Sequence, residues 1–270
     1  MPVFDSYSSG VVAASVSTLL VFPVFKLSER QQLSPSDLRR SVLASLRAEG
    51  MRAMLLRGLI PPLLQRLVCR SLMYGNYEVA LNQLQNVGLC RKNRSTQSAA
   101  ALLAGSLEAV LVPCERVQAL LVDPRHNTRF PHAFAVLVDL VRRRNALHEL
   151  YLGFTPVLLR NGPSFALYLW LKDSTAEQLP KIVQQNAFLA GAFSGGVASF
   201  LTGIVFYPIN TIKMNMQAQI EGEHLGFLTT TRLVASRGIG HLYAGLGAHC
   251  MGSVLSWAIF QGLYQLLKNR

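Results

Sequence analysis

Residues 187–213, AFLAGAFSGGVASFLTGIVFYPINTIK, carry the pattern that decides the fold: an apolar segment runs into a proline and then turns polar. The first 23 of these residues contain no charge, and about 20 apolar residues suffice for a helix to cross a bilayer. Pro208 lies at the end of this run, and the same proline ends two earlier apolar segments, as Pro23 and Pro113. The chain therefore holds three copies of one unit.

Each copy has the same internal order. The prolines are 90 and 95 residues apart, and a second apolar segment follows a polar stretch and a turn that ends in Gly58, Gly153 or Gly245. We expect each proline to kink its helix by removing a backbone hydrogen bond. The polar stretches are expected to form short helices lying along the membrane surface, within 34–49, 131–144 and 226–237. The repeats, 1–90, 91–182 and 183–270, then form one integral membrane domain of six spans, which indicates transport across a bilayer.

The composition agrees with a membrane protein. Half of the residues are hydrophobic and only 15% are charged, whereas a soluble domain carries about a quarter charged residues. Four charged residues interrupt apolar segments: Arg66, Arg70, Glu108 and Arg160. A charge inside a span usually faces an aqueous cavity, and the alternative for the arginines is snorkelling from a helix end to the interface.

The net charge of +12 does not indicate a nucleic-acid binder, because the basic residues follow the repeat instead of forming one patch. Of the 26 lysines and arginines, 16 lie in 26–57, 116–144 and 213–237, which all follow the prolines. Positive charge accumulates on the side of a membrane protein that stays inside. Both termini are therefore expected on the opposite side.

No pattern indicates an enzyme. The four cysteines lack metal-ligand spacing and a disulfide framework, and the six histidines are scattered. No glycine-rich nucleotide fingerprint follows a strand. We therefore expect no catalytic residue, no metal site and no cofactor.

The proline segments resemble the signature of the mitochondrial carrier family, in which an acid stands two residues after the proline and a base five residues after it. Pro113 with Glu115 and Pro208 with Lys213 match in part. The departures are a missing acid and base in the first repeat, a missing base in the second and a missing acid in the third, at Phe25, Ser28, Gln118 and Asn210. The resemblance covers essentially the whole chain. It implies an all-α membrane protein whose six helices form a pseudo-threefold barrel with short surface helices on the matrix side.

The resemblance also implies two gates that close the cavity alternately. At the matrix end, Glu115 and Lys213 are expected to form the one intact ion pair, and polar contacts of Gln32 and Gln217 to help closure. At the cytoplasmic end the expected gate residues are Glu78, Asp173 and Lys268, with Asp173 facing Lys268. Each partly exposed pair is worth only about 0–1 kcal/mol.

Substrate contacts in this family come from the even helices, seven and eight residues after the turn glycine. Together with positions one turn farther along, the expected substrate-binding residues are Gln65, Arg66, Arg70, Arg160, Asn161, Gly252, Ser253 and Ser256. A guanidinium fork in this setting fits a carboxylate or phosphate, so the cargo is expected to be an anion.

The strings FPVFKLSERQQ, PCERVQALL, LLRNG and FYPIN resemble the subgroup of the mitochondrial NAD carrier and its orphan relatives. This makes NAD the leading candidate among anionic, nucleotide-like metabolites. That subgroup tends to have an arginine where this chain has Gly252. The alternatives are a carrier for another anion such as a carboxylate, and a carrier-fold protein that does not transport.

The same resemblance bears on the protein's partners and its location in the cell. The resemblance implies a monomer in the mitochondrial inner membrane, with both termini facing the intermembrane space. The expected partners are the small anionic substrate and membrane lipids, without nucleic acid. Backbone N–H groups at the matrix-side glycine turns are expected to suit an anionic lipid such as cardiolipin.

Overall fold

The computed structural model describes residues 2–34, 75–88, 93–181, 183, 187–220 and 224–268, together with positions 42, 43, 47, 50, 59 and 63. Every regular element in these described residues is helical, which confirms the all-α class. The chain divides into two compact units. Unit 1 comprises Met1–Leu67, Leu111–Pro156 and Tyr207–Arg270, and unit 2 comprises Val68–Val110 and Val157–Phe206.

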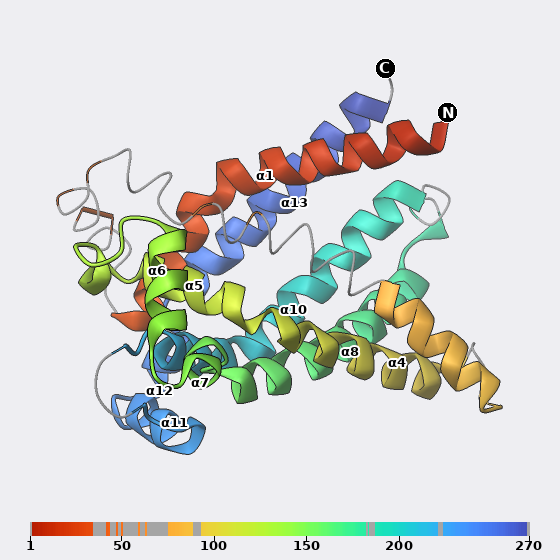
Figure 1. Cartoon of the computed structure of the whole chain (residues 1–270). Helices are drawn as coiled ribbons and strands as arrows, with labels where there is room; N and C mark the ends of the chain where they lie inside the picture. The colour runs from red at the N-terminus through yellow and green to blue at the C-terminus, as the bar shows by residue number, and fades with distance from the viewer. Residues whose placement is uncertain are drawn as a thin grey trace. The chain divides into compact units, whose positions relative to one another are not determined.

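Unit 1 is built around two long helices that lie side by side, α1 (Pro2–Leu33) and α13 (Leu246–Lys268). Figure 1 shows both chain termini at the same end of this pair. The unit also contains α5 (Val112–Val122), the C-terminal part of α10 (Ala187–Gln217) and five short elements. These are η2 (Pro124–His126), α6 (Ala133–Arg142), α7 (Ala146–Leu150), α11 (Phe227–Ser236) and α12 (Ile239–Leu242).

The short helices α6 and α11 lie within the ranges 131–144 and 226–237 that the sequence predicts. In α6, Val136 and Leu140 are fully buried against Leu120, Leu121 and Phe130. These two residues are four apart, so they share one face of the helix. The His132 ring caps α6 by accepting the Ala135 N–H at 3.1 Å. The predicted surface helix at 34–49 lies almost wholly outside the described residues.

Two turn glycines act as the repeat pattern predicts. Gly153 and Gly245 have φ of +86° and +85°, a backbone region that favours glycine. Each also allows a close approach: a Cβ at Gly153 would lie 2.8 Å from the Gln217 side chain, and one at Gly245 would lie 2.6 Å from the Ser28 carbonyl oxygen. Gly58 lies outside the described residues.

Unit 2 contains α4 (Arg94–Leu107), most of α8 (Phe154–Gln178), the N-terminal part of α10 and a helical stretch at 75–86. Its core joins Ala101 and Ala104 of α4 to Phe165 of α8, with Tyr77 packed against them. The helices α4 and α8 approach closely, because a Cβ on Gly105 would lie 2.6 Å from the Asn161 carbonyl oxygen. Small residues permit such backbone contact between helices in lipid.

Pro113 has a different local structure from Pro23 and Pro208. Pro23 lies inside α1 and Pro208 inside α10, and both helices continue past them. Pro113 instead stands in the first turn of α5, directly after the 3-10 turn η1 (Glu108–Leu111). A proline is well accommodated there because its missing N–H has no partner in the first helical turn.

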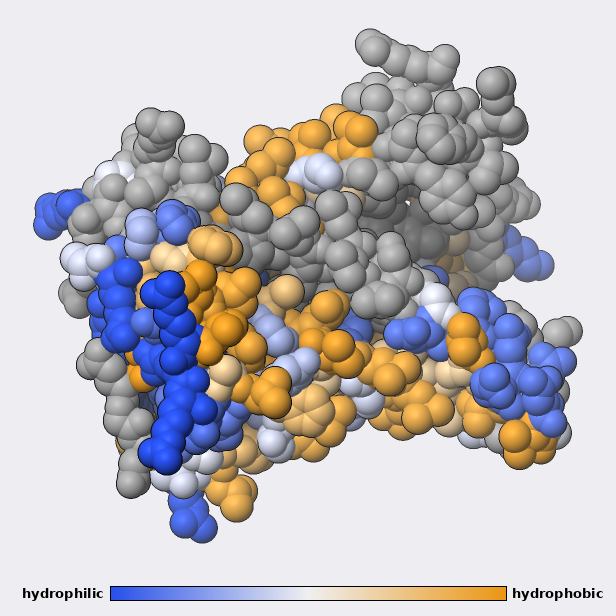
Figure 2. Space-filling view, viewed as in Figure 1, coloured by the Kyte–Doolittle hydropathy of each residue, from blue (hydrophilic) through white to orange (hydrophobic). Residues whose placement is uncertain are grey.

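Two stretches of the described residues are long and apolar enough to cross a membrane: Arg94–Val122 and Phe193–Gln217. In the most apolar 18 residues of each stretch, only about one third of the residues are buried. Most of these residues therefore face outward. Leu102, Leu103 and Leu107 of α4 and Phe193 and Val205 of α10 are exposed. Figure 2 shows hydrophobic residues over α4. This distribution suits helices surrounded by lipid.

Candidate functional site

The predicted matrix-gate pair is in contact within unit 1. Lys213 Nζ on α10 donates to Glu115 Oε2 on α5 at 3.2 Å. Both side chains are largely buried, with exposures of 10% and 7%. Burial removes most of the solvent that would otherwise screen the pair, so losing either partner is costly.

The two departures from the motif in the first repeat, Phe25 and Ser28, are compensated one helical turn farther along α1. Gln118 on α5 donates to Glu29 at 2.6 Å, and Asn210 on α10 donates to the Gln32 side chain at 3.3 Å. Glu29 follows Phe25 by four residues, and Gln32 follows Ser28 by four, so each pair shares a helix face. The three contacts join α1, α5 and α10 pairwise. Gln32 is a predicted gate residue, whereas Glu29 is not, although its i, i+4 relation with Phe25 identifies it.

Gln217 differs from Gln32. Its side chain is fully buried, and within the described residues neither of its amide atoms has a hydrogen-bond partner. The side chain instead packs beneath Gly153, and its backbone carbonyl accepts a hydrogen bond from Arg116. Gln217 therefore contributes packing and a backbone acceptor at this end of α10.

Arg116 organises a second charged cluster in unit 1. Its side chain is fully buried and donates to the carbonyls of Met216, Gln217 and Gln219 at the end of α10. Its guanidinium lies 3.5 Å from Glu149 on α7. Arginine suits this position because its fork supplies several donors to the carbonyls that a helix end leaves without partners. In the sequence, Arg116 stands out only as one of the basic residues after Pro113.

Glu149 is the acidic centre of this cluster. It accepts from His224 at 2.7 Å and from Arg143 at 3.4 Å. Burial by itself raises the pKa of Glu149, but the His224 hydrogen bond and the charges of His224, Arg143 and Arg116 outweigh burial and lower it. Arg143 also donates to the Ile220 carbonyl at 2.7 Å, so a second arginine holds the segment that follows α10.

Two predicted substrate residues form a polar chain in unit 2. Arg160 Nε donates to Asn161 Oδ1 at 2.9 Å, and Asn161 Nδ2 donates to Glu108 Oε2 at 3.2 Å. Asn161 is buried, and Arg160 and Glu108 are partly exposed. Glu108 was noted in the sequence only as a charge within an apolar segment. Its bond to Asn161 makes it a third member of the candidate site.

The α13 positions lie in unit 1. Gly252 is buried against the Phe25 ring, and Ser253 Oγ donates to the His249 carbonyl at 2.9 Å. Ser256 is partly exposed one turn farther along. The predicted substrate residues of the second helix, Gln65, Arg66 and Arg70, lie outside the described residues.

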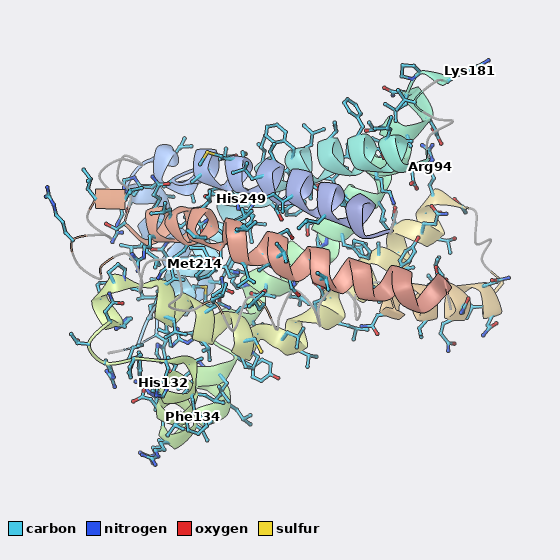
Figure 3. All side chains as sticks on the ribbon, turned by 90° about the horizontal axis from the view of Figure 1, so that it is seen from above. Arg94, His132, Phe134, Lys181, Met214 and His249 are labelled. Atoms are coloured by element: carbon cyan, nitrogen blue, oxygen red, sulfur yellow. The ribbon has the colours of Figure 1, made fainter. Side chains whose placement is uncertain are left out.

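The predicted cytoplasmic gate is described only in part. Glu78 and Asp173 are exposed in unit 2, and the Lys268 side chain lies outside the description. Arg94, at the start of α4 (Figure 3), donates to both carboxylate oxygens of Glu177 at 2.7 Å. Arg94, Trp170 and Asp173 line one small pocket. Unit 2 thus has its own charged contact between the ends of α4 and α8.

No group of three His, Cys, Asp or Glu side chains is placed to hold a metal ion in the part of the chain that the structure describes. Cys114 and Cys250 are free thiols. The charged clusters described above consist of ion pairs and hydrogen bonds between side chains and helix ends. These contacts hold the helices and helix ends together.

Comparisons with known proteins agree with this architecture. A family model described as "Mitochondrial carrier protein" matches residues 184–270. The mitochondrial nicotinamide adenine dinucleotide transporter SLC25A51 of Homo sapiens is 34% identical over 265 residues, which cover 97% of this chain and 88% of that protein. SLC25A52 of Homo sapiens, also described as a mitochondrial nicotinamide adenine dinucleotide transporter, is 34% identical over 97% of this chain and 88% of that protein. Solute carrier family 25 member 53 of Homo sapiens is 31% identical over 98% of this chain and 88% of its own length. The chain belongs to the mitochondrial carrier family.

Proposed function

We propose that this protein carries NAD, or a closely related anionic nucleotide, across the mitochondrial inner membrane. The observation that carries the proposal is the likeness over 97% of the chain to proteins described as mitochondrial NAD transporters. These relatives are described as transporters and not as enzymes. The named alternatives, a carboxylate carrier and a non-transporting relative, have no comparable support.

The proposed architecture has six spans in three repeats, 1–90, 91–182 and 183–270, around a central cavity. We assign the two apolar stretches of α4–α5 and α10 as the third and fifth of these proposed spans. The protein is proposed to act as a monomer with both termini in the intermembrane space. An anionic lipid such as cardiolipin is proposed to bind at the matrix-side glycine turns.

The proposed substrate site uses Arg160 as its anion-binding group. An arginine within a span is costly unless it has a partner, and the Glu108–Asn161 chain supplies polar neighbours when no substrate is bound. The phosphates of a dinucleotide fit the guanidinium fork. The proposed gates alternate around this site: Glu115–Lys213 with its neighbours at the matrix end, and Glu78, Asp173 and Lys268 at the cytoplasmic end.

The test is uptake of labelled NAD into liposomes that contain the purified protein. Arg160→Ala removes the fork, and hydrogen bonds to a charged group are worth about 1.5–3 kcal/mol. We therefore expect uptake to fall at least tenfold in this variant, and less in Arg160→Lys, which keeps the charge. Arg237→Ala is the matched control, because Arg237 is exposed beyond the end of α11. Equal uptake by Arg160→Ala and the control would overturn the assignment of this site.

A further inference from the structure

Two buried hydroxyl groups meet at the glycine turn that leads into α13, within unit 1. Tyr207 Oη on α10 donates to the Ala244 carbonyl at 2.9 Å, and Ser28 Oγ on α1 donates to the Gly245 carbonyl at 2.9 Å. The two hydroxyl oxygens are 3.1 Å apart, and both residues are only 1% exposed. The contact therefore joins α1, α10 and the start of α13 at a point that solvent does not reach.

The positions of both hydroxyls are fixed by their surroundings. The Tyr207 ring stacks on Tyr243 with an interplanar angle of 11°. Gly245 has no side chain, and a Cβ there would lie 2.6 Å from the Ser28 carbonyl oxygen and 3.0 Å from Tyr207 Oη. Glycine at this turn therefore allows α1 and α10 to approach its backbone closely enough for the two hydroxyls to bind its carbonyls.

This contact lies where the family motif would place an ion pair between the first and third repeats. The motif has its base at position 28 and its acid at position 210, but this chain has Ser28 and Asn210. Neither side chain carries a charge, so that ion pair cannot form. Asn210 donates to Gln32, whereas Ser28 meets Tyr207. Tyr207 precedes Asn210 by three residues and so shares its helix face.

The two interfaces of α10 at this end of the molecule are held by different chemistry. The α5–α10 interface has the ion pair of Glu115 with Lys213, and the α1–α10 interface has the neutral hydroxyls of Ser28 and Tyr207. Neutral groups avoid the cost of taking two charges out of water, but a buried hydroxyl or carbonyl that loses its partner is still penalised. The hydroxyl contact therefore resists the separation of α1 from α10.

We propose that Ser28 and Tyr207 form a hydroxyl latch, which closes the matrix gate between the first and third repeats in place of the missing ion pair. This inference rests on the proposed alternating access, because a gate matters only in a carrier that opens at both ends. The two side chains are positioning residues that act on the helices and not on the cargo. The latch breaks when α1 separates from α10, so its strength sets how often the matrix end opens.

A cluster of apolar side chains farther along the same helices can report on this opening. It contains Leu33 of α1, Ala119 and Val122 of α5, and Met214 and Ala218 of α10, of which Met214 is labelled in Figure 3. Ala119 is fully buried. The cluster draws on all three repeats, so separating α1 from α5 and α10 exposes it. A thiol at position 119 would then react only while the matrix end is open.

The experiment measures the rate at which N-ethylmaleimide labels Ala119→Cys in the purified full-length protein, with each labelled cysteine identified by mass spectrometry. Cys114 is an exposed free thiol and serves as the internal reference. Tyr207→Phe and Ser28→Ala each remove one hydroxyl of the latch. Tyr243→Phe is the matched control, because it removes a tyrosine hydroxyl from an exposed residue that stacks on the same ring.

We expect Tyr207→Phe and Ser28→Ala each to accelerate labelling at position 119 by about fivefold, as the loss of one net hydrogen bond would. Tyr243→Phe should label at the rate of the unmodified latch. The double variant should be slower than the product of the two single effects predicts, because the two hydroxyls contact each other. The labelling rate of Cys114 should be the same in every variant.

A purely structural role is distinguished by Gly105→Ala, which crowds the α4–α8 contact in unit 2. If Gly105→Ala lowers the melting temperature as much as Tyr207→Phe does and accelerates labelling equally, the hydroxyls serve only general stability and the inference is overturned. Labelling of Tyr207→Phe and Ser28→Ala at the rate of Tyr243→Phe would overturn it as well.

The outcomes also separate this inference from the proposed function, because the labelling reaction contains no substrate. If labelling accelerates as expected but liposomes with the wild-type protein take up no NAD, the NAD assignment is wrong and the latch stands. If NAD is taken up and the latch variants label as the control does, the latch is wrong and the function stands.

Discussion

Replacing only Lys213 of the Glu115–Lys213 ion pair should destabilise the protein more than replacing both residues by neutral ones. The pair is 3.2 Å apart, and its side chains are only 10% and 7% exposed. Lys213→Met leaves the Glu115 carboxylate buried without its lysine, and breaking a buried pair in this way costs about 3–5 kcal/mol. The double variant Glu115→Gln/Lys213→Met removes both charges, and replacing a buried pair by neutral groups is often close to neutral.

The assay is the melting temperature of the purified protein in detergent, for wild type, both single variants and the double variant. A double-mutant cycle then isolates the interaction between the two residues. We expect the double variant to melt above Lys213→Met, by an amount that corresponds to most of the lost stability. Additive losses would refute the reasoning, because they would mean that the two side chains do not depend on each other.

Three further predictions follow from the same contacts. Because its neighbours lower the pKa of Glu149, the carboxylate stabilises the fold above the ordinary glutamate pKa of about 4.3, and this contribution disappears as the pH falls through the lowered value. The gap in melting temperature between wild type and Glu149→Gln should therefore be full above about pH 5 and should close at lower pH, and a gap that does not change with pH would contradict this. Gly105→Ala should destabilise the protein by about 1–3 kcal/mol, because its Cβ would lie 2.6 Å from the Asn161 carbonyl oxygen, whereas Gly203→Ala, where no atom lies within 4 Å, should be tolerated in the same thermal assay. Gln118→Lys should place a cation next to Glu29, strengthen the α1–α5 contact and slow NAD uptake, and faster uptake would show that this contact does not restrain the transport cycle.

The repeat pattern predicts the helices and one contact well. The ranges 131–144 and 226–237 contain α6 and α11, because an amphipathic stretch between two apolar runs has few other ways to bury its apolar face. The Glu115–Lys213 pairing follows from the family motif. It could be predicted because the carboxylate and the amine stand at fixed distances from their prolines.

The contacts of Glu29, Arg116 and Phe25 could not be predicted in the same way. Glu29 meets Gln118 because of the way α1 and α5 pack, and a single sequence does not encode the relative rotation of two helices. Arg116 looks like any basic residue after a proline, and only the end of α10 beside it explains its burial. The contact between Phe25 and Gly252 joins residues more than 200 positions apart, and neither residue carries a charge that would suggest a partner.

NAD transport is tested most directly by the uptake of labelled NAD into liposomes that contain the wild-type protein, in competition with nucleotides and carboxylates. We predict saturable uptake that unlabelled NAD suppresses, that a carboxylate does not suppress, and that is lost in Arg160→Ala. Uptake no greater than into protein-free liposomes would contradict it, as would uptake that a carboxylate abolishes as effectively as NAD does.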